Sequence, residues 1–232
     1  MITFEEFKIF KFQVVDSTND VAYELIKKTK LPMVVVVADE QRKGRGRAGH
    51  SWHSQAGGLY FSIAMKSRGI TEDSHLIVYS SLPVAETLLG YGLNPRIKLP
   101  NDVYIVRKKI SGILGERKQD FLIIGIGINV NQKNFPEDIS HLATSMFIET
   151  GMTYDRDEIL YDFLDNFKNL LIDRESRYQR WLNFVSVIGK KVSFTYRKRK
   201  VEGVVENIDS SLNLQVNGEK YNIYEIFDFR EP

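Results

Sequence analysis

A glycine-rich basic segment is the first part of this sequence whose residue types and spacing could do chemistry. It runs from Gln41 to Ser54 and contains Gly44-Arg45-Gly46-Arg47, followed by Trp52. Glycines allow backbone amides to turn toward a ligand, and guanidinium groups pair with phosphate or carboxylate through two hydrogen bonds. Such a loop binds an anion, is merely solvated, or contacts nucleic acid, and the indole of Trp52 favours a binding site with an aromatic wall. The P-loop signature Gly-Lys-Ser/Thr is absent.

A lysine and a carboxylate form the second candidate group. Asp102 ends the run Lys98-Leu99-Pro100-Asn101-Asp102, and Lys109 opens the run Lys109-Ile110-Ser111-Gly112. If the two runs pair as a hairpin, the ammonium and the carboxylate approach one another. An ion pair of this kind contributes little to stability at a surface, so it indicates a functional site only if it lines a pocket. The histidines show no metal-ligand spacing, and no serine lies in a nucleophile elbow.

The third candidate is the polar run Asp16-Ser17-Thr18-Asn19, which lies where a strand pattern gives way to a helical one. Ser17 with Asp20 three residues later resembles a capping box, in which the side chains satisfy the first amides of a helix. The same junction suits ligand binding, because exposed amides and short polar side chains gather there. From these residues alone, capping is the simpler interpretation.

Alternating and helical patterns predict the elements that position these groups. A helix is expected over Ser74–Gly90, kinked or started late by Pro83, and another through Ile159, Phe163, Phe167 and Leu170 or Leu171, with Tyr178, Trp181 and Phe184 continuing a helical face. Strands are expected over Lys8–Val15, Val34–Ala38, Leu59–Met65, Ile97–Val106, Lys109–Glu116 and Phe121–Asn129, with a turn at Arg107-Lys108. Gly125 and Gly127 within the last strand indicate that another group approaches its backbone closely.

From Gly189 onward the pattern changes to short β-rich segments. They cover Lys191–Tyr196, Val201–Ile208, Leu212–Val216 and Lys220–Ile223, separated by turns at Arg197–Lys200, Asp209–Ser211 and Asn217-Gly218. Asn-Gly between two strands predicts a type I′ hairpin turn. We therefore expect a domain boundary between residues 188 and 189, with residues 189–232 forming a small SH3-like β-barrel.

Composition excludes several classes of protein. The 232 residues carry 32 Lys+Arg and 30 Asp+Glu, a net charge of +2 that argues against bulk binding of nucleic acid. With 43% hydrophobic and 27% charged residues, the chain can bury a core and is not disordered. The absence of cysteine removes disulfides, thiolate metal sites and thioester mechanisms. No apolar run reaches the roughly 20 residues of a membrane helix, and Glu5-Glu6 near Met1 exclude a signal core, so we expect a cytoplasmic location.

Taken together, these residues resemble the biotin protein ligases over nearly the whole chain. The resemblance follows five ordered motifs, namely Asp16–Asn19, Gln41 with the Gly44–Arg47 loop and Trp52, Gly57-Gly58-Leu59-Tyr60, Lys98–Asp102 with Lys109–Gly112, and Gly125–Asn129. It implies an α+β fold in which a mixed β-sheet backed by helices, similar to the class II synthetase core, forms a catalytic domain over residues 1–188.

The resemblance also implies an activity. Members of this family join biotin and ATP to give biotinyl-5′-AMP, and then transfer biotin to a lysine of a biotin carboxyl carrier protein such as that of acetyl-CoA carboxylase. By resemblance, Lys109, Arg45, Arg47 and Asp102 are catalytic, with Asp102 positioning the incoming lysine. The biotin and adenylate contacts would come from Ser17, Thr18, Asn19, Gln41, Arg45, Gly46, Arg47, Trp52, Lys109, Gly112 and Asn129. Mg²⁺ would be held mainly by the nucleotide, with no protein metal site.

This chain departs from the family pattern at three positions. Leu99 stands where tryptophan is usual, and Ala48 and His50 stand where further arginines are common, which puts the closure of the loop in question. The N-terminal helix-turn-helix of the bifunctional members is not expected here, so we expect no DNA binding, while a homodimer is expected from relatives.

Three alternatives stay open at this point. A lipoate or related acyl ligase would share the core, although the relatives that transfer octanoyl groups depend on a cysteine that this chain lacks. A nucleic-acid-binding module would use Arg42–Arg47 and the basic stretch Lys190–Lys200. A catalytically inactive dimerisation protein is disfavoured, since Lys109 and Asp102 are both present.

Overall fold

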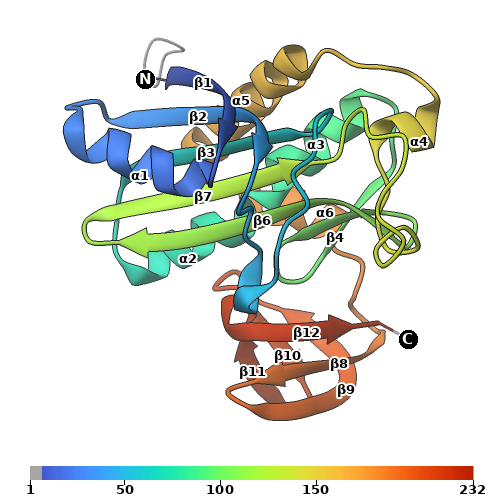
Figure 1. Cartoon of the computed structure of the whole chain (residues 1–232). Helices are drawn as coiled ribbons and strands as arrows, with labels where there is room; N and C mark the ends of the chain where they lie inside the picture. Colours follow the sequence, from blue (N-terminus) through green and yellow to red (C-terminus); the bar gives the residue numbers. More distant parts are fainter. Residues whose placement is uncertain (1–6, 232) are drawn as a thin grey trace.

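A seven-stranded mixed sheet forms the larger part of the computed structural model, which describes residues 7–231 (Figure 1). Its strand order is β1-β2-β3-β7-β6-β5-β4, and only the β1–β2 pair is parallel. The strands span Phe7–Val15 (β1), Met33–Gln41 (β2), Leu59–Lys66 (β3), Pro95–Lys98 (β4), Asp102–Ile105 (β5), Lys108–Lys118 (β6) and Phe121–Ile128 (β7).

Helices cover both faces of this sheet. They span Thr18–Lys28 (α1), Ile70–Tyr79 (α2), Ser81–Gly90 (α3), Met146–Thr150 (α4), Arg156–Ile172 (α5) and Arg177–Phe184 (α6). The valine run of β2 explains the arrangement, because alternate side chains of a strand point to opposite faces. Val34 and Val36 pack with Ala22 and Ile26 of α1, whereas Val35 and Val37 join the main core on the other face. The predicted α+β fold with a mixed sheet backed by helices is confirmed.

Three sequence predictions in this part of the chain were wrong in detail. The expected helix over residues 74–90 is two helices that meet at Ser80, and Pro83 falls in the first turn of the second, where its missing N–H is tolerated. The expected strand Ile97–Val106 is a hairpin, with Lys98 opposite Asp102 and a cis Leu99-Pro100 bond in its turn. The following turn lies at Val106-Arg107, one residue earlier than expected, because Ile105 pairs with Lys108.

A second, five-stranded antiparallel sheet of SH3-like type follows (Figure 1). Its order is β11-β10-β9-β8-β12, built from Lys191–Tyr196 (β8), Arg199–Ile208 (β9), Asn213–Val216 (β10), Glu219–Asn222 (β11) and Ile226–Arg230 (β12). Asn217 and Gly218 both have positive φ, as the type I′ prediction requires. Strand β12 was not predicted. The boundary at 188/189 remains a prediction, and residue 232 of the expected barrel lies outside the described residues.

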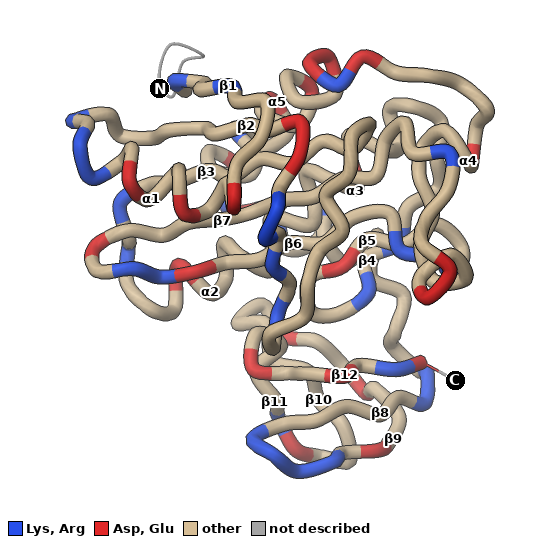
Figure 2. The backbone as a smooth tube through the Cα atoms, viewed as in Figure 1, with Lys and Arg blue, Asp and Glu red and all other residues tan. Residues whose placement is uncertain are grey.

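Basic and acidic residues both occur along the strands and turns of this second sheet (Figure 2). Three of the six basic residues in the stretch Lys190–Lys200 form ion pairs with acids, namely Lys190 with Glu231, Arg197 with Glu225 and Lys200 with Glu202. This pairing weakens the nucleic-acid alternative. Within residues 7–231, no helix is long and apolar enough to span a bilayer.

Candidate active site

A cavity of about 570 Å³ opens where the end of β1, the loop of residues 42–54, the β4–β5 turn and strands β6 and β7 meet. Ten of the eleven residues that the sequence predicts as substrate contacts line it, and so does the fourth predicted catalytic residue, Asp102. The exception is Gly46, which lines an adjoining hollow of about 610 Å³ on the other side of the same loop. The fold therefore brings together residues more than 100 positions apart in the sequence.

Glycines of β6 and β7 form the floor of the cavity. A Cβ atom on Gly127 would lie 2.3 Å from Nε1 of Trp52, and one on Gly112 would lie 3.0 Å from the same indole. A Cβ atom on Gly125 would lie 2.3 Å from Oδ1 of Asn19. The predicted close approach is thus real, and the approaching groups are the Trp52 ring and the Asn19 amide. The indole Nε1 is buried without a hydrogen-bond partner.

A buried chain of polar side chains forms one end of the cavity. Oε1 of Gln41 accepts from the backbone N–H of Thr18 at 2.9 Å and lies 3.0 Å from its hydroxyl, while Nε2 of Gln41 donates to Ser54 at 2.8 Å. Behind them the hydroxyl of Ser62, on β3, lies 2.7 Å from Thr18 Oγ1 and 2.6 Å from Asn19 Oδ1. These contacts leave the Thr18–Gln41 edge facing the cavity as a hydrogen-bonding surface.

The expected capping box is not formed. Ser17 occupies the N-cap position of α1, but its side chain makes no capping hydrogen bond. The reason lies with Asp20, whose carboxylate is bound by Arg45 at 2.7 and 2.9 Å and by Lys118 at 2.8 Å. Ser17 is instead buried at the cavity wall, as its predicted ligand-binding role requires.

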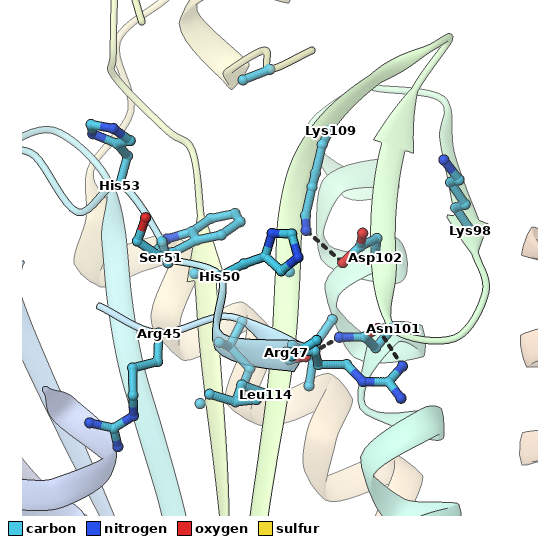
Figure 3. A pocket seen from close by; sticks show the side chains of 18 of the residues that line it. Arg45, Arg47, His50, Ser51, His53, Lys98, Asn101, Asp102, Lys109 and Leu114 are labelled. Atoms are coloured by element: carbon cyan, nitrogen blue, oxygen red, sulfur yellow. Dashed lines mark hydrogen bonds and ion pairs between the residues drawn. The ribbon is translucent and has the colours of Figure 1, made fainter. Parts of the chain in front are cut away.

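The predicted lysine–carboxylate pair lines the same cavity, and Figure 3 shows the two side chains pointing toward one another. Nζ of Lys109 is 2.7 Å from Oδ1 of Asp102 and 5.2 Å from the Trp52 ring centroid. The pair is about three-quarters buried, with side-chain exposures of 30% and 24%. It therefore lines a pocket and is not a surface contact.

Arg45 is directed away from this pair, toward α1 (Figure 3). Its guanidinium makes a bidentate contact with Asp20 and lies 3.2 Å from Glu116 on β6. The hydrogen bond from Arg45 lowers the pKa of Asp20 to about 2, and Asp20 in turn raises the pKa of Arg45. Neither acid was anticipated from the sequence, and together they occupy most of the donors of a residue predicted to neutralise phosphate.

Arg47 links the glycine-rich loop to the second sheet. One amino group donates to the backbone oxygen of Tyr224 at 2.7 Å, and the guanidinium carbon lies 4.6 Å from the ring centroid of Phe227. Its other amino group donates to Asn101 at 3.3 Å. Burial lowers the pKa of Arg47, although arginine stays charged at neutral pH.

Several residues of the site were not predicted from the sequence. One such group lies in the loop after β7. This loop is anchored by the predicted residue Asn129, whose amide donates to the backbone oxygen of Thr144 at 2.9 Å. That loop and β12 complete the cavity wall, and neither carried a motif that would have marked it. The unpredicted lining residues include Asn101, Leu114, Asp138, Ile139, Leu142, Ala143, Phe227, Asp228 and Phe229.

Different parts of the cavity suit different parts of a substrate. Thr18 and Gln41 can hold a neutral polar head group, the glycine floor under Trp52 suits an apolar ring or chain, and Lys109 and Arg47 offer positive charge to an anion. Within residues 7–231, no group of three or more acidic or histidine side chains could hold a metal ion, so any Mg²⁺ at this cavity would be held mainly by nucleotide phosphates. The cavity is thus equipped for a reaction between an organic acid and a nucleotide.

Comparison with known proteins agrees with this assignment. Residues 11–132 match the biotin/lipoate A/B protein ligase family. The bifunctional ligase/repressor BirA of Bacillus spizizenii is 33% identical over 179 residues, which cover 73% of this chain and 53% of that protein. The chain thus spans about half the length of this relative. The biotin–[acetyl-CoA-carboxylase] ligase of Paracoccus denitrificans is 28% identical, with 88% of this chain and 91% of that protein covered.

Solved structures show the same architecture. The biotin protein ligase of Aquifex aeolicus in complex with biotin and ATP superposes with a TM-score of 0.82 at 31% identity, covering 97% of this chain and 99% of that one. The biotin protein ligase of Leishmania major in complex with biotinyl-5-AMP is 22% identical with a TM-score of 0.67, a likeness of fold. These alignments cover 97% and 93% of the present chain, so they include residues of both sheets.

Proposed function

The chain belongs to the biotin/lipoate A/B protein ligase family, and on that premise we propose that it is an ATP-dependent biotin protein ligase. It would activate biotin as biotinyl-5′-AMP and then transfer biotin to a lysine of a biotin carboxyl carrier protein. The observation that carries this proposal is one cavity lined by both the Thr18–Gln41 polar edge and the Lys109–Asp102 pair.

The first step brings the carboxylate of biotin against the α-phosphate of ATP. The two anions repel, and fixed cations in a partly dry site lower that repulsion without having to reorganise. Lys109 is the cation best placed for this role, because its ammonium lies beside the Trp52 wall. Arg47 supplies a second positive charge, held in place by Tyr224 and Phe227. Mg²⁺ bound to the nucleotide would neutralise further phosphate charge.

Arg45 has a different place in this proposal from the one expected from sequence. Asp20 and Glu116 already balance its charge, so in this conformation it supports the wall between α1 and β6. It would reach a phosphate only after the loop of residues 42–54 rearranges. The remaining predicted contacts keep their roles as proposals, with Asn129 next to the adenylate and with Ser17 and the backbone of Gly112 beside the head group.

In the second step, the lysine of the carrier protein attacks as a neutral amine, so its ammonium group must first lose a proton. Asp102, at the same cavity as Lys109, would receive the incoming lysine of the carrier protein and assist its deprotonation. Transfer then releases AMP and leaves biotin in an amide bond. A cytoplasmic location and a homodimer complete the proposal, both as expectations from the family resemblance.

A lipoate or related acyl ligase is the second candidate, because the matching family includes such enzymes. The buried polar edge formed by Gln41 and Thr18 favours a ureido head group over a dithiolane ring. The deciding experiment incubates the protein with ATP, Mg²⁺ and either biotin or lipoate and detects the acyl-adenylate by mass spectrometry. Biotinyl-AMP alone supports the proposal, lipoyl-AMP alone moves the substrate to the second candidate, and neither adduct from folded protein contradicts both.

A further inference from the structure

We propose that Thr144 and Glu149 are positioning residues for Lys109. They fix the short segment Leu142–Thr144, to which the backbone of Lys109 is hydrogen-bonded, and so determine where the ammonium of Lys109 lies. The inference deepens the proposed function and rests on it, because it concerns the cation assigned to the first step. No sequence motif marked either residue.

Lys109 lies on β6 where regular pairing of the sheet ends. Ser111, two residues further along β6, forms the last β6–β7 pair, with Ile128. On the other side of β6, the pairing with β5 passes from Lys109 to Ser111 and leaves Ile110 as an extra, bulged residue. The neighbouring strands therefore do not hold the backbone of Lys109 from both sides.

The loop after β7 supplies the missing partner. The backbone N–H of Lys109 donates to the oxygen of Leu142 at 2.7 Å, and the N–H of Thr144 donates to the oxygen of Lys109 at 2.9 Å. Ala143, between them, forms a parallel β-bridge with Lys109. Both polar groups of the Lys109 backbone are thus bound by Leu142–Thr144, so a shift of this segment moves Lys109.

Thr144 is held in turn by two side chains. Its backbone oxygen accepts from Nδ2 of Asn129 at 2.9 Å, and its hydroxyl donates to the carboxylate of Glu149 on α4. Thr144 is fully buried, so without Glu149 its hydroxyl would lose its partner away from water. Thr144 and Glu149 are not among the residues that line the cavity, so both act at a distance from the substrate.

The precision of this support matters for the chemistry. The ammonium of Lys109 lies 2.7 Å from Asp102 and faces the ring of Trp52. A fixed cation stabilises a developing anion without reorganising, and a displacement of about 1 Å in such a group can cost up to a hundredfold in rate. Loosening the segment should therefore slow adenylation even though no substrate contact is removed.

Two pairs of variants test the two residues. Thr144→Val keeps the shape of the side chain and removes its hydroxyl, whereas Thr144→Ser keeps the hydroxyl. Glu149→Ala removes the acceptor and Glu149→Gln restores one, and this pair serves if Thr144→Val does not fold. Thr87→Val is the matched control, because Thr87 is 2% exposed and its hydroxyl donates to the backbone oxygen of Pro83 at 2.8 Å in α3.

The first measurement is the single-turnover rate of biotinyl-AMP formation at saturating ATP. We expect this rate to fall about tenfold in Thr144→Val and Glu149→Ala, while the Kd of biotin measured without ATP changes by less than about twofold. Thr144→Ser and Glu149→Gln should recover most of the rate, and Thr87→Val should keep it.

The second measurement asks whether Thr144 acts through Lys109. In a Lys109→Ala background, Thr144→Val should cause no further loss of rate, because the group that it positions is gone. The backbone amide of Lys109 should also exchange its hydrogen faster in Thr144→Val. The amide of Ile113, on the same strand and bonded to the oxygen of Asn101 at 3.0 Å, should not change.

An unchanged rate in both Thr144→Val and Glu149→Ala would overturn the proposal. A loss as large in Thr87→Val, or a full further loss in the Lys109→Ala background, would show a general effect on stability and would overturn it as well. Failure of the proposed function gives a separate result, because the wild-type protein would then form no biotinyl-AMP. The exchange of the Lys109 amide would still report whether Thr144 holds it.

Discussion

The ammonium of Lys109 and the carboxylate of Asp102 meet at 2.7 Å, although the strands that carry them do not place the two residues opposite one another. Asp102 pairs with Gly112, and Lys109 pairs with Tyr104, with a register shift between Val103 and Tyr104. Because Gly112 has no side chain, the space opposite Asp102 is open to the longer Lys109 side chain, which a Cβ on Gly112 would approach at 3.0 Å. The pair is therefore a product of the bulge and the glycine together.

Lys109→Ala should abolish adenylation and leave the fold intact. Removing one fixed charge from a developing anion typically costs about 10² to 10³ in rate, whereas a partly exposed ion pair contributes little to stability. The measurement is the initial rate of biotinyl-AMP formation, together with the melting temperature. Lys108→Ala, one residue away and outside the cavity wall, is the control and should keep its rate. Near-normal turnover in Lys109→Ala would remove Lys109 from the mechanism.

Asp102→Asn should separate the two half-reactions. Asparagine can still accept from Lys109, so adenylate formation should fall by no more than about threefold. It cannot take up a proton, so transfer to a carrier lysine should slow by about 10², the usual contribution of a general base. Single-turnover transfer from preformed biotinyl-AMP to a purified carrier domain measures this step alone. If formation slows as much as transfer, Asp102 acts in adenylation and the assignment is wrong.

Gly127→Ala should close the cavity without unfolding the protein. The new Cβ would stand 2.3 Å from Nε1 of Trp52, so the indole must move off the floor. We expect biotin affinity to fall more than tenfold and the tryptophan fluorescence to change. The chain has 2 Trp, and Trp181 is fully buried elsewhere, so such a change reports on Trp52.

Gly90→Ala is the matched control for that substitution. No atom lies within 4 Å of a Cβ built on Gly90, and its φ is not positive. Gly90 is the last residue of α3, where alanine reduces the entropy of the unfolded chain, so affinity should not change and stability should rise slightly. Equal loss of affinity in both glycine variants would contradict the assigned role of the floor.

Local sequence patterns were sufficient to predict which side chains line the cavity, but not which residues those side chains contact. The Gly125 and Gly127 spacing predicted a close approach, and Asn217-Gly218 predicted a turn, because both signals lie within a few residues of the feature. Arg45 is bound by Glu116, 71 positions away, and no local pattern contains that information. The same contact network explains the wrong capping box, since Asp20 was taken as a helix cap while its carboxylate binds Arg45.

Strand β12 was missed for a related reason. Its residue Asp228 has a positive φ of 50°, and the pairing of β12 with β8 shifts register between Phe227 and Arg230. A bulge of this kind interrupts the alternation by which strands are recognised. The irregular strand is also the one that supplies Phe227 to the cavity wall.

Phe227→Leu should loosen the glycine-rich loop, because Arg47 lies over that ring at 4.6 Å. A cation–π contact of this kind contributes about 1 kcal/mol, which corresponds to roughly fivefold faster amide exchange in the loop. Hydrogen exchange of residues 42–50 in the empty protein is the measurement. In the wild type these amides should already exchange faster than those of β3 and β7, and resistance equal to the core strands would contradict a loop that orders over the adenylate. Phe12→Leu, on exposed β1, is the control.

The final prediction concerns the pH dependence of stability. The hydrogen bond from Arg45 and the contact with Lys118 lower the pKa of Asp20 from 3.8 to about 2. Because the folded pKa lies below the unfolded value, the stabilisation is complete above about pH 4 and is lost as the pH falls toward 2. The Asp20 side chain is 47% exposed, so after discounting for solvent screening the contribution is about 1 kcal/mol.

Asp20→Asn should therefore lower the free energy of unfolding by about 1 kcal/mol at pH 7, and the difference from wild type should shrink between pH 4 and pH 3. Urea unfolding at pH 7, 5, 4 and 3 gives the four comparisons. Asp120→Asn, at an exposed aspartate in the β6–β7 turn, is the control variant. A difference that stays constant down to pH 3 would mean that Asp20 stabilises the protein through the shape of its hydrogen bonds and not through its charge. Arg45 would then be held by geometry that asparagine can also supply, and the loop would keep its position at low pH.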